Sequence, residues 1–131
     1  MKPAELLLPI DQAGSVSKIF RFYFDGTGLA AYAEVWNKNN TLKLLDLTTT
    51  WLNRAEVGSW TKSFAVNGVV QTVTYTVRCS LKISATPLQT SSIKEDGFWD
   101  LLLQYPDGSR FYEVRGPAPL RVRATRGPAL T

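Results

Sequence analysis

Hydrophobic and polar residues alternate with a period of two along most of this chain, which is the pattern of half-buried β-strands. The clearest example lies within residues 97–126, where Trp99, Leu101 and Leu103 fall on one face of an expected strand. Pro106-Asp107-Gly108 follows and predicts a tight turn, because proline fixes φ early in a turn and glycine accepts a positive φ. The chain should therefore reverse here and form a β-hairpin.

Two more strands are expected after this turn. The first covers residues 109–115 and should end at Gly116-Pro117-Ala118-Pro119, because neither proline can donate a hydrogen bond to a neighbouring strand. In the second, Leu120 and Val122 alternate with arginines, so that one face of the strand should be exposed to solvent. A strand of this kind suits the edge of a sheet.

The upstream sequence predicts the partners of these strands. They cover residues 16–24, 29–36, 42–51, 60–66 and 69–83, and the last should bend or divide near Arg78. Asn67-Gly68 signals a type I′ hairpin, and residues 84–96 form a loop with room for one helical turn. Seven or eight strands of this kind predict an all-β protein, folded as a single antiparallel β-sandwich. The predicted core comprises Trp60, Phe64, Val73, Tyr75, Val77, Trp99, Leu101 and Leu103.

The start of the chain is expected to be an arm, residues 1–14, ahead of one sandwich domain at residues 15–131. The arm carries an apolar run that needs a cover, either on a neighbouring subunit or as a first strand or short helix: Leu6, Leu7, Leu8 and Ile10. No apolar run approaches the roughly 20 residues that span a bilayer. The arm also lacks the features of a signal peptide, so a protein without a membrane segment is expected.

The absence of histidine narrows the possible chemistry. A histidine-based catalytic triad, a histidine general base and an imidazole zinc site are excluded, and one cysteine cannot form an internal disulfide or a thiolate cluster. Cys79 is expected to be buried among apolar neighbours. Asp46, Asp100 and Glu113 could pair as in a glycosidase, although nothing in their spacing requires it. We therefore expect no catalytic activity, no metal and no cofactor.

Charge and aromatic content indicate a binding function without identifying the partner. The chain has a net charge of +4, and arginines crowd its last segment. They could bind nucleic-acid phosphates, but no recognition helix or exposed aromatic row is evident, and acidic groups of a protein partner are favoured. The candidate protein interface therefore combines the arm with this arginine cluster: Leu6, Leu7, Leu8, Ile10, Arg115, Arg121, Arg123 and Arg126.

The four tryptophans allow a further alternative. Exposed together they would form a stacking platform for the sugar rings of a host glycan, whereas buried they would fill a core. Trp60 and Trp99 alternate with polar neighbours as core residues do, so burial is favoured, with Trp36 or Trp51 as exceptions. A carbohydrate-binding β-sandwich module therefore remains open beside a structural protein.

The C-terminal sequence resembles the closing part of small immunoglobulin-like β-sandwich domains in phage tail, baseplate and fibre proteins. The resemblance rests on Gly97-Phe98-Trp99-Asp100-Leu101-Leu102-Leu103, Asp107-Gly108, Gly116 and Leu120-Arg121-Val122, and Asp46-Leu47-Thr48 is similar to the family's Asp-Leu-Thr turn. Pro117-Ala118-Pro119 departs from the family pattern.

This resemblance implies a non-enzymatic structural protein of a virion, made in the cytoplasm of a bacterial host. It implies assembly with other virion proteins as a homo-oligomer, with a trimer preferred by analogy with fibre proteins. A capsid cement or decoration protein is the alternative within the same class.

Overall fold

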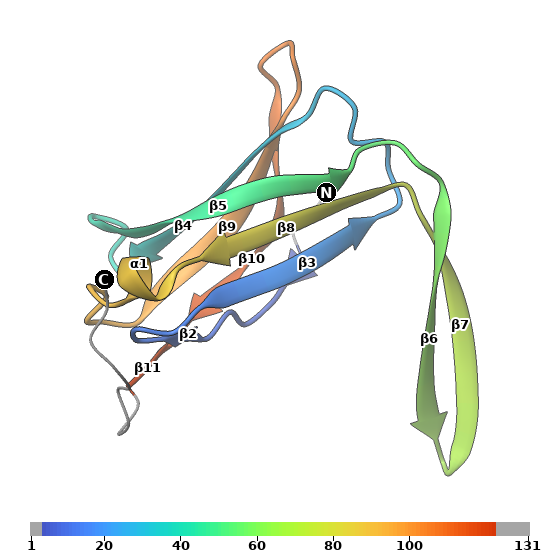
Figure 1. Ribbon diagram of the computed structural model, residues 1–131, viewed down its shortest axis with the longest axis horizontal. Helices are drawn as coiled ribbons and strands as arrows, with labels where there is room; N and C mark the ends of the chain where they lie inside the picture. The colour runs from blue at the N-terminus through green and yellow to red at the C-terminus, as the bar shows by residue number, and fades with distance from the viewer. Residues whose placement is uncertain (1–3, 123–131) are drawn as a thin grey trace. The chain divides into compact units, whose positions relative to one another are not determined.

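A computed structural model describes residues 4–122, which form eleven β-strands and one short helix (Figure 1). The all-β prediction is confirmed. In chain order the elements are β1 (Ala4–Glu5), β2 (Ile10–Asp11), β3 (Val16–Phe22), β4 (Ala30–Asn37), β5 (Lys43–Asn53), β6 (Gly58–Val66), β7 (Val69–Val77), β8 (Cys79–Ala85), α1 (Pro87–Thr90), β9 (Gly97–Gln104), β10 (Arg110–Ala118) and β11 (Leu120–Arg121).

The largest sheet has seven strands in the order β1-β10-β9-β4-β5-β8-β3. It is mixed, because β1 runs parallel to β10 while β9 runs antiparallel to both β10 and β4. Two smaller sheets pair β11 with β2 and β6 with β7. This arrangement corrects the expectation of two antiparallel sheets packed face to face, since one mixed sheet takes up most of the strands.

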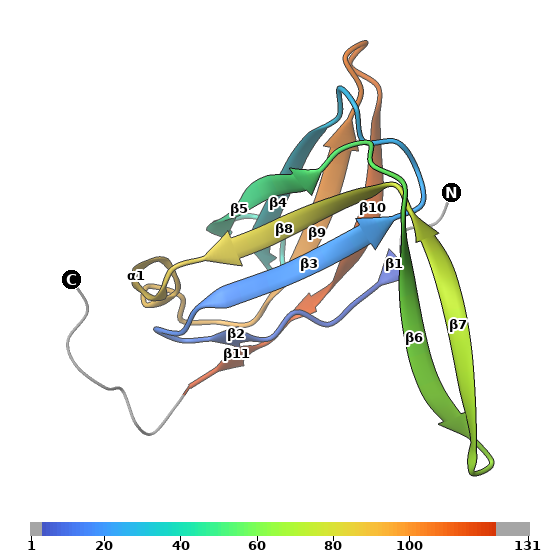
Figure 2. The same ribbon diagram turned by 45° about the vertical axis from the view of Figure 1, so that its right-hand side comes forward.

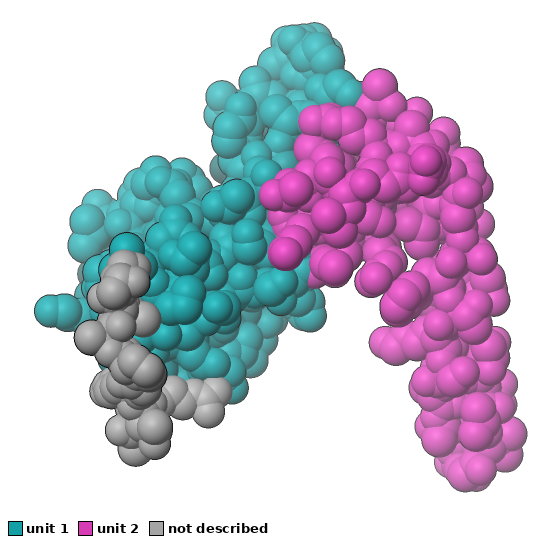
Figure 3. Space-filling view, in the orientation of Figure 1, with its two compact units in different colours: residues 1–18, 28–49, 83–131 teal, residues 19–27, 50–82 magenta. Residues whose placement is uncertain are grey.

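The described residues divide into two compact units, drawn in teal and magenta in Figure 3. Unit 1 contains residues 4–18, 28–49 and 83–122, and unit 2 contains residues 19–27 and 50–82. The predicted N-terminal arm, as far as it is described, belongs to unit 1 together with β4, β9 and β10.

The core of unit 1 is built on the inward face of β9. Trp99, Leu101 and Leu103 are at most 2% exposed, as their alternation predicted. The antiparallel register places Val35 of β4 opposite Trp99, and Val35 is also buried. Fully burying one such side chain contributes about 1.5–3 kcal/mol, so this face of the sheet supplies much of the driving force for folding.

The arm lies alongside β10 and β11 as an additional parallel strand. The backbone N–H groups of residues 6, 8, 10 and 12 donate to the carbonyls of residues 115, 117, 119 and 121 over 2.8–2.9 Å. Leu8 and Ile10 are consequently buried in their own chain, 4% and 1% exposed. The reason for expecting them on a neighbouring subunit is therefore removed, because their cover is intramolecular.

β10 continues to Ala118, beyond the break expected at Gly116 and Pro117. The N–H and C=O groups of one strand residue point to the same side, and the Pro117 carbonyl accepts from Leu8 on the arm side. The missing proline donor would thus have faced the arm. On that side the Leu6 carbonyl accepts a hydrogen bond of 2.9 Å from the indole N–H of Trp99 in place of one from residue 117. The strand can therefore contain a proline at this position.

The other connections agree closely with the sequence. Asn67 and Gly68 both have positive φ, as a type I′ hairpin requires. Residue 78 separates β7 from β8, and α1 occupies the predicted loop. Thr86 caps this helical turn by accepting from the Gln89 N–H over 3.2 Å.

The predicted core is wrong for the β6–β7 hairpin, which belongs to unit 2. Trp60, Phe64 and Tyr75 are between 42% and 49% exposed, and Val73 and Val77 are only half-buried. Alternation correctly located these strands, but β6 and β7 pair only with each other within residues 4–122, and they appear as a two-stranded ribbon in Figure 2. Among the described residues no third strand joins this ribbon, so its large side chains are not covered as those of a sheet core are.

Candidate functional site

One face of the β6–β7 hairpin presents large apolar side chains to solvent. In the antiparallel register Trp60 lies opposite Tyr75, and Val66 lies opposite Val69. Strand alternation places Phe64 and Lys62 on this same face, between Trp60 and Val66. We call this surface the hairpin face; its members are Trp60, Lys62, Phe64, Val66, Val69, Gln71, Val73 and Tyr75.

The reverse side of the hairpin is rich in hydroxyl groups. Thr61 and Thr74 lie opposite each other with their hydroxyl oxygens 3.2 Å apart, and the hydroxyls of Ser63 and Thr72 are 3.1 Å apart. These cross-strand hydrogen bonds help to hold the two strands in register. The hairpin is therefore two-faced, apolar on one side and hydroxyl-bearing on the other.

The charge on the hairpin face is positive. Lys62 is the only charged residue of the hairpin, residues 58–77. Within the described chain its ammonium makes no hydrogen bond or ion pair. Arg21 adds a second cation, with its guanidinium 3.8 Å from the ring centre of Trp60. Glu56 lies with Arg21 and Trp60 in a depression of about 230 Å³ at the base of the hairpin, so two cations and one anion border this surface.

Unit 1 has a second exposed aromatic surface, on the face of its sheet opposite to the core. Tyr32 of β4 pairs with Leu102 of β9, which pairs in turn with Tyr112 of β10. Trp36 and Phe98 form the next such pair on the same side. Tyr32, Phe98 and Tyr112 are each about half exposed, from 49% to 52%. We call this surface the sheet face; its apolar members are Tyr32, Trp36, Phe98, Leu102 and Tyr112.

A row of charged residues crosses the sheet face. Glu34 is paired in register with Asp46 of β5 on one side and with Asp100 of β9 on the other, and Asp100 is paired with Arg115. Lys43 joins two of the carboxylates, since its Nζ lies 3.1 Å from Glu34 and 3.0 Å from Asp46. These contacts hold the pKa of Lys43 above its usual range.

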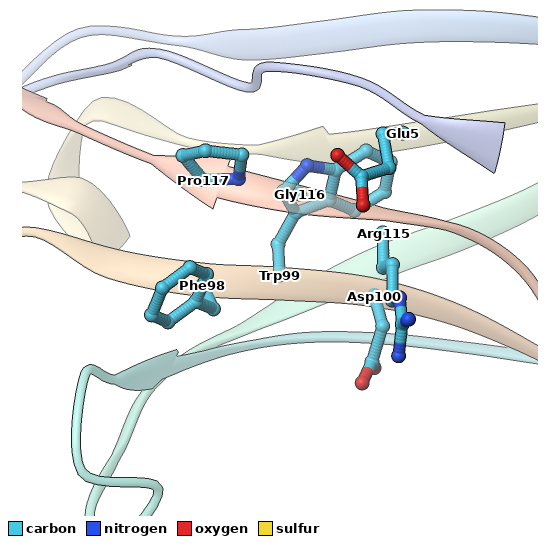
Figure 4. Close-up of a pocket in the computed structure, with 7 residues that line it drawn as sticks. All are labelled: Glu5, Phe98, Trp99, Asp100, Arg115, Gly116 and Pro117. Atoms are coloured by element: carbon cyan, nitrogen blue, oxygen red, sulfur yellow. The ribbon is translucent and has the colours of Figure 1, made fainter. Parts of the chain in front are cut away.

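Asp100 is the carboxylate that this row leaves without a partner. No hydrogen bond or ion pair reaches it from the described residues, although Figure 4 shows Arg115 pointing the same way from the adjacent strand. Partial burial, and secondly repulsion from Glu34, raise the pKa of Asp100, while Arg115 opposes this shift. The middle of the sheet face therefore holds a half-buried carboxylate without a hydrogen bond or ion pair from the described residues, although the charge of Arg115 acts on it.

The three carboxylates considered for catalysis lie on three different strands, β5, β9 and β10. Asp46 and Asp100 lie on opposite sides of Glu34 with β4 between them. Glu113 lies at the irregularity of β10, where the register shifts between Tyr112 and Val114, and burial raises its pKa. Among residues 4–122 no cluster of three or more potential metal ligands is found.

The predicted interface residues are separated by the structure. Leu8 and Ile10 are core residues and Leu6 is half-buried, while Leu7 remains exposed. Arg115 lies beside Glu5, Phe98 and Asp100 at a depression of about 420 Å³ (Figure 4), and the Nε of Arg121 binds Asp11 at 2.8 Å. Arg123 and Arg126 lie outside the described residues. Arg115 is thus the member of the proposed set that the structure places beside Phe98 and Asp100 of the sheet face.

The two tryptophans of unit 1, Trp36 and Trp99, do not lie on the same face of the sheet. Trp36 lies on the sheet face and Trp99 on the buried face of the same sheet. Trp51 is half-buried, and Trp60, which was expected in the core, is the most exposed of the four. The row of tryptophans that a sugar-binding module was expected to show is therefore absent from the described part of unit 1.

Sequence reasoning missed both aromatic surfaces. Trp60 and Phe64 were assigned to the core because alternation alone does not reveal whether a strand face is covered. One signal was available: Lys62 lies between them on the same face, and a lysine in the middle of an apolar face is rarely fully buried. On β9, Phe98 and Leu102 beside Asp100 carried the same signal.

Comparison of the sequence with protein-family models and with curated proteins finds no match. None of the helical structure within residues 4–122 is long and apolar enough to cross a membrane.

Proposed function

We propose that this chain is a non-enzymatic structural protein of a bacteriophage particle, a component of a tail, baseplate or fibre whose role is to hold subunits together. The observation that carries this proposal is the exposed hairpin face. A two-stranded hairpin is marginally stable at best in water, and within residues 4–122 this one presents Trp60, Phe64 and Tyr75 as exposed side chains. Aromatic residues are enriched in protein interfaces and supply most of their binding energy.

The assignment to a bacteriophage particle rests on the sequence resemblance to phage tail, baseplate and fibre proteins. The motif from Gly97 to Leu103 corresponds to β9, Asp107-Gly108 to the turn after it, and Gly116 to the point in β10 where the arm passes closely. The finer assignment, an immunoglobulin-like domain, also belongs to this proposal. It is supported by β9 and β10 lying antiparallel across that turn.

Assembly as a homo-oligomer with other virion proteins is part of the same proposal, with a trimer preferred by analogy with fibre proteins. Synthesis in the cytoplasm of the bacterial host and incorporation into the virion follow from it. A capsid cement or decoration protein would use the same kind of exposed apolar surface. A carbohydrate-binding module is the alternative from another class, and the row of exposed tryptophans expected for it is not found among the described residues of unit 1.

The experiment that tests this function locates the protein in particles. Antibodies raised against the purified chain are applied to particles from lysates of the bacterium that carries the gene, purified on a density gradient. We expect the chain to sediment with intact particles and immunogold label to mark the tail or its distal end. Label on the capsid would favour the decoration protein, and absence of the chain from intact particles would contradict the proposal.

A further inference from the structure

We propose that the hairpin face of one copy docks on the sheet face of a second copy of this chain, with Lys62 of the first meeting Asp100 of the second. This inference rests on the proposed role in subunit assembly and identifies the partner as another copy of the same chain. The contact is a packing of two sheet faces, which in proteins lie about 10 Å apart.

The two faces have matching patterns along their strands. On β6 the order is Trp60, Lys62, Phe64, and on β9 it is Phe98, Asp100, Leu102, in each case at every second residue. Successive members of each set are therefore about 7 Å apart. When the lysine of one set faces the aspartate of the other, the apolar residues on both sides also face each other.

The charges at the two centres are complementary and unsatisfied. Lys62 and Asp100 each lack a hydrogen bond or ion pair within residues 4–122. Burying an apolar surface around a lone charge is unfavourable unless the charge is paired. Docking these two faces supplies each charge with a partner between the apolar residues that precede and follow it on its strand, where a pair gains more than it does in water.

The same charges disfavour the two symmetric alternatives. A pair of hairpin faces would bring together two copies of Lys62, which is the only charged residue of the hairpin. A pair of sheet faces would bring together two copies of Asp100, the carboxylate that no hydrogen bond or ion pair from residues 4–122 reaches. Docking of unlike faces avoids both repulsions, and since each copy carries one surface of each kind, the contact is heterologous and continues from copy to copy into a ring or a chain.

Two variants separate the surfaces. A hairpin variant carries Trp60→Thr and Phe64→Thr, and a sheet variant carries Tyr32→Thr and Phe98→Thr. These side chains are between 42% and 51% exposed and threonine is a good strand former, so both variants should stay folded, with the circular dichroism of the unsubstituted protein. The matched controls are Val70→Thr on the hydroxyl side of the hairpin and Leu42→Thr in the loop before β5, both at exposed positions.

Light scattering with size-exclusion chromatography gives the readout over a wide concentration range. We expect concentration-dependent assembly of the unsubstituted protein and of both controls. Each double variant should be a monomer, with the association constant reduced by about 100-fold or more, since each removes two central aromatic residues. If the hairpin changes unfold the chain, Lys62→Glu replaces them, and if the sheet changes do so, Asp100→Lys replaces those, each with an expected loss of about tenfold.

Mixing the two variants gives the decisive measurement. The hairpin variant retains an intact sheet face and the sheet variant retains an intact hairpin face, so the mixture forms one contact and stops at a complex of two chains. Assembly of the sheet variant like that of the unsubstituted protein would overturn the proposal, as would a mixture that stays monomeric. A concentrated unsubstituted protein that is monomeric would overturn it too, while the particle-labelling experiment would still test the structural function separately.

Discussion

At the scale of single residues, Asp100 makes stability depend on pH in a direction that is unusual for a carboxylate. Its pKa is raised in the folded chain, chiefly by partial burial, so the folded state binds the proton more tightly than the unfolded state. The stabilisation by the protonated form is fully present below the ordinary pKa of 3.8 and is lost as pH rises through the raised value. Ionised Asp100 therefore opposes folding at neutral pH.

We predict that Asp100→Asn increases the free energy of unfolding at neutral pH. The amide keeps the shape of the carboxyl group and removes the charge that partial burial disfavours. The gain should shrink as pH falls and vanish below about 3.8, where the aspartic acid is also neutral. Urea unfolding of dilute protein across this pH range provides the measurement, with Glu95→Gln in the exposed loop before β9 as control. A loss of stability that is the same at every pH would show that the carboxylate has a favourable structural contact.

A second residue-scale prediction concerns the tie between Trp99 and the arm. Trp99→Phe keeps an aromatic ring in the core but removes the indole N–H that donates to the Leu6 carbonyl over 2.9 Å. We expect a loss of about 1–2 kcal/mol in unfolding free energy and faster hydrogen exchange at the Leu8 and Ile10 amides. Trp36→Phe is the control, because its indole binds the Glu34 carboxylate at the surface, and it should change stability by less than about 0.5 kcal/mol. Unchanged exchange in the arm would show that the backbone ladder alone holds it.

At the scale of elements, alternation and turn chemistry located most strands, and tertiary pairing decided the rest. The Asn67-Gly68 turn and the β9 strand follow from local rules, because positive φ and period two are properties of a short stretch. Whether a strand finds neighbours is not a local property. The expected core at Trp60 and Tyr75 failed for that reason, and so did the expected break of β10 at Pro117, whose missing donor faces the arm.

The candidate site was accessible from the sequence only in part. Arg115 was identified by the charge of the last segment, and it does adjoin the sheet face. Leu8 and Ile10 were chosen as an interface because an apolar arm needs a cover, and they lie in the core because β10 and β11 provide it. Lys62 and Asp100 each lie in the middle of an apolar strand face, and a charged residue there is rarely fully buried. This signal would have indicated that both faces are exposed.

At this scale we predict that the hairpin is dispensable for folding of unit 1. Gly58 and Val77 lie directly opposite each other, so residues 59–76 can be replaced by an Asn-Gly turn without moving the flanking strands. Unit 1 should remain folded, because β6 and β7 pair with no other strand among the described residues. Backbone NMR spectra should retain the resonances of Leu101 and Leu103, while self-association should disappear. Collapse of those core resonances would show that the hairpin is needed for folding.

At the scale of the whole molecule, long-range and short-range electrostatics act on assembly with opposite signs. Each copy carries a net charge of +4, so two copies repel each other at a distance. This repulsion is screened beyond about 8 Å at an ionic strength of about 0.15 M, whereas a pair in contact is screened much less. Assembly at physiological salt should therefore depend on which charges meet at the contact rather than on the net charge.

Charge reversal distinguishes these two contributions. We predict that Lys62→Glu and Asp100→Lys each weaken association by about tenfold or more at an ionic strength of about 0.15 M, because each places like charges at the centre of the contact. A chain with both changes should associate nearly as well as the unsubstituted protein, since the pair is restored with its sign reversed. The control Lys38→Glu changes the net charge as much as Lys62→Glu but acts in an exposed loop of unit 1, and it should strengthen association slightly or leave it unchanged. Sedimentation equilibrium on the unsubstituted protein, the two single variants and the double variant gives the coupling energy between the two residues. If the two single effects simply add in the double variant, Lys62 and Asp100 do not meet.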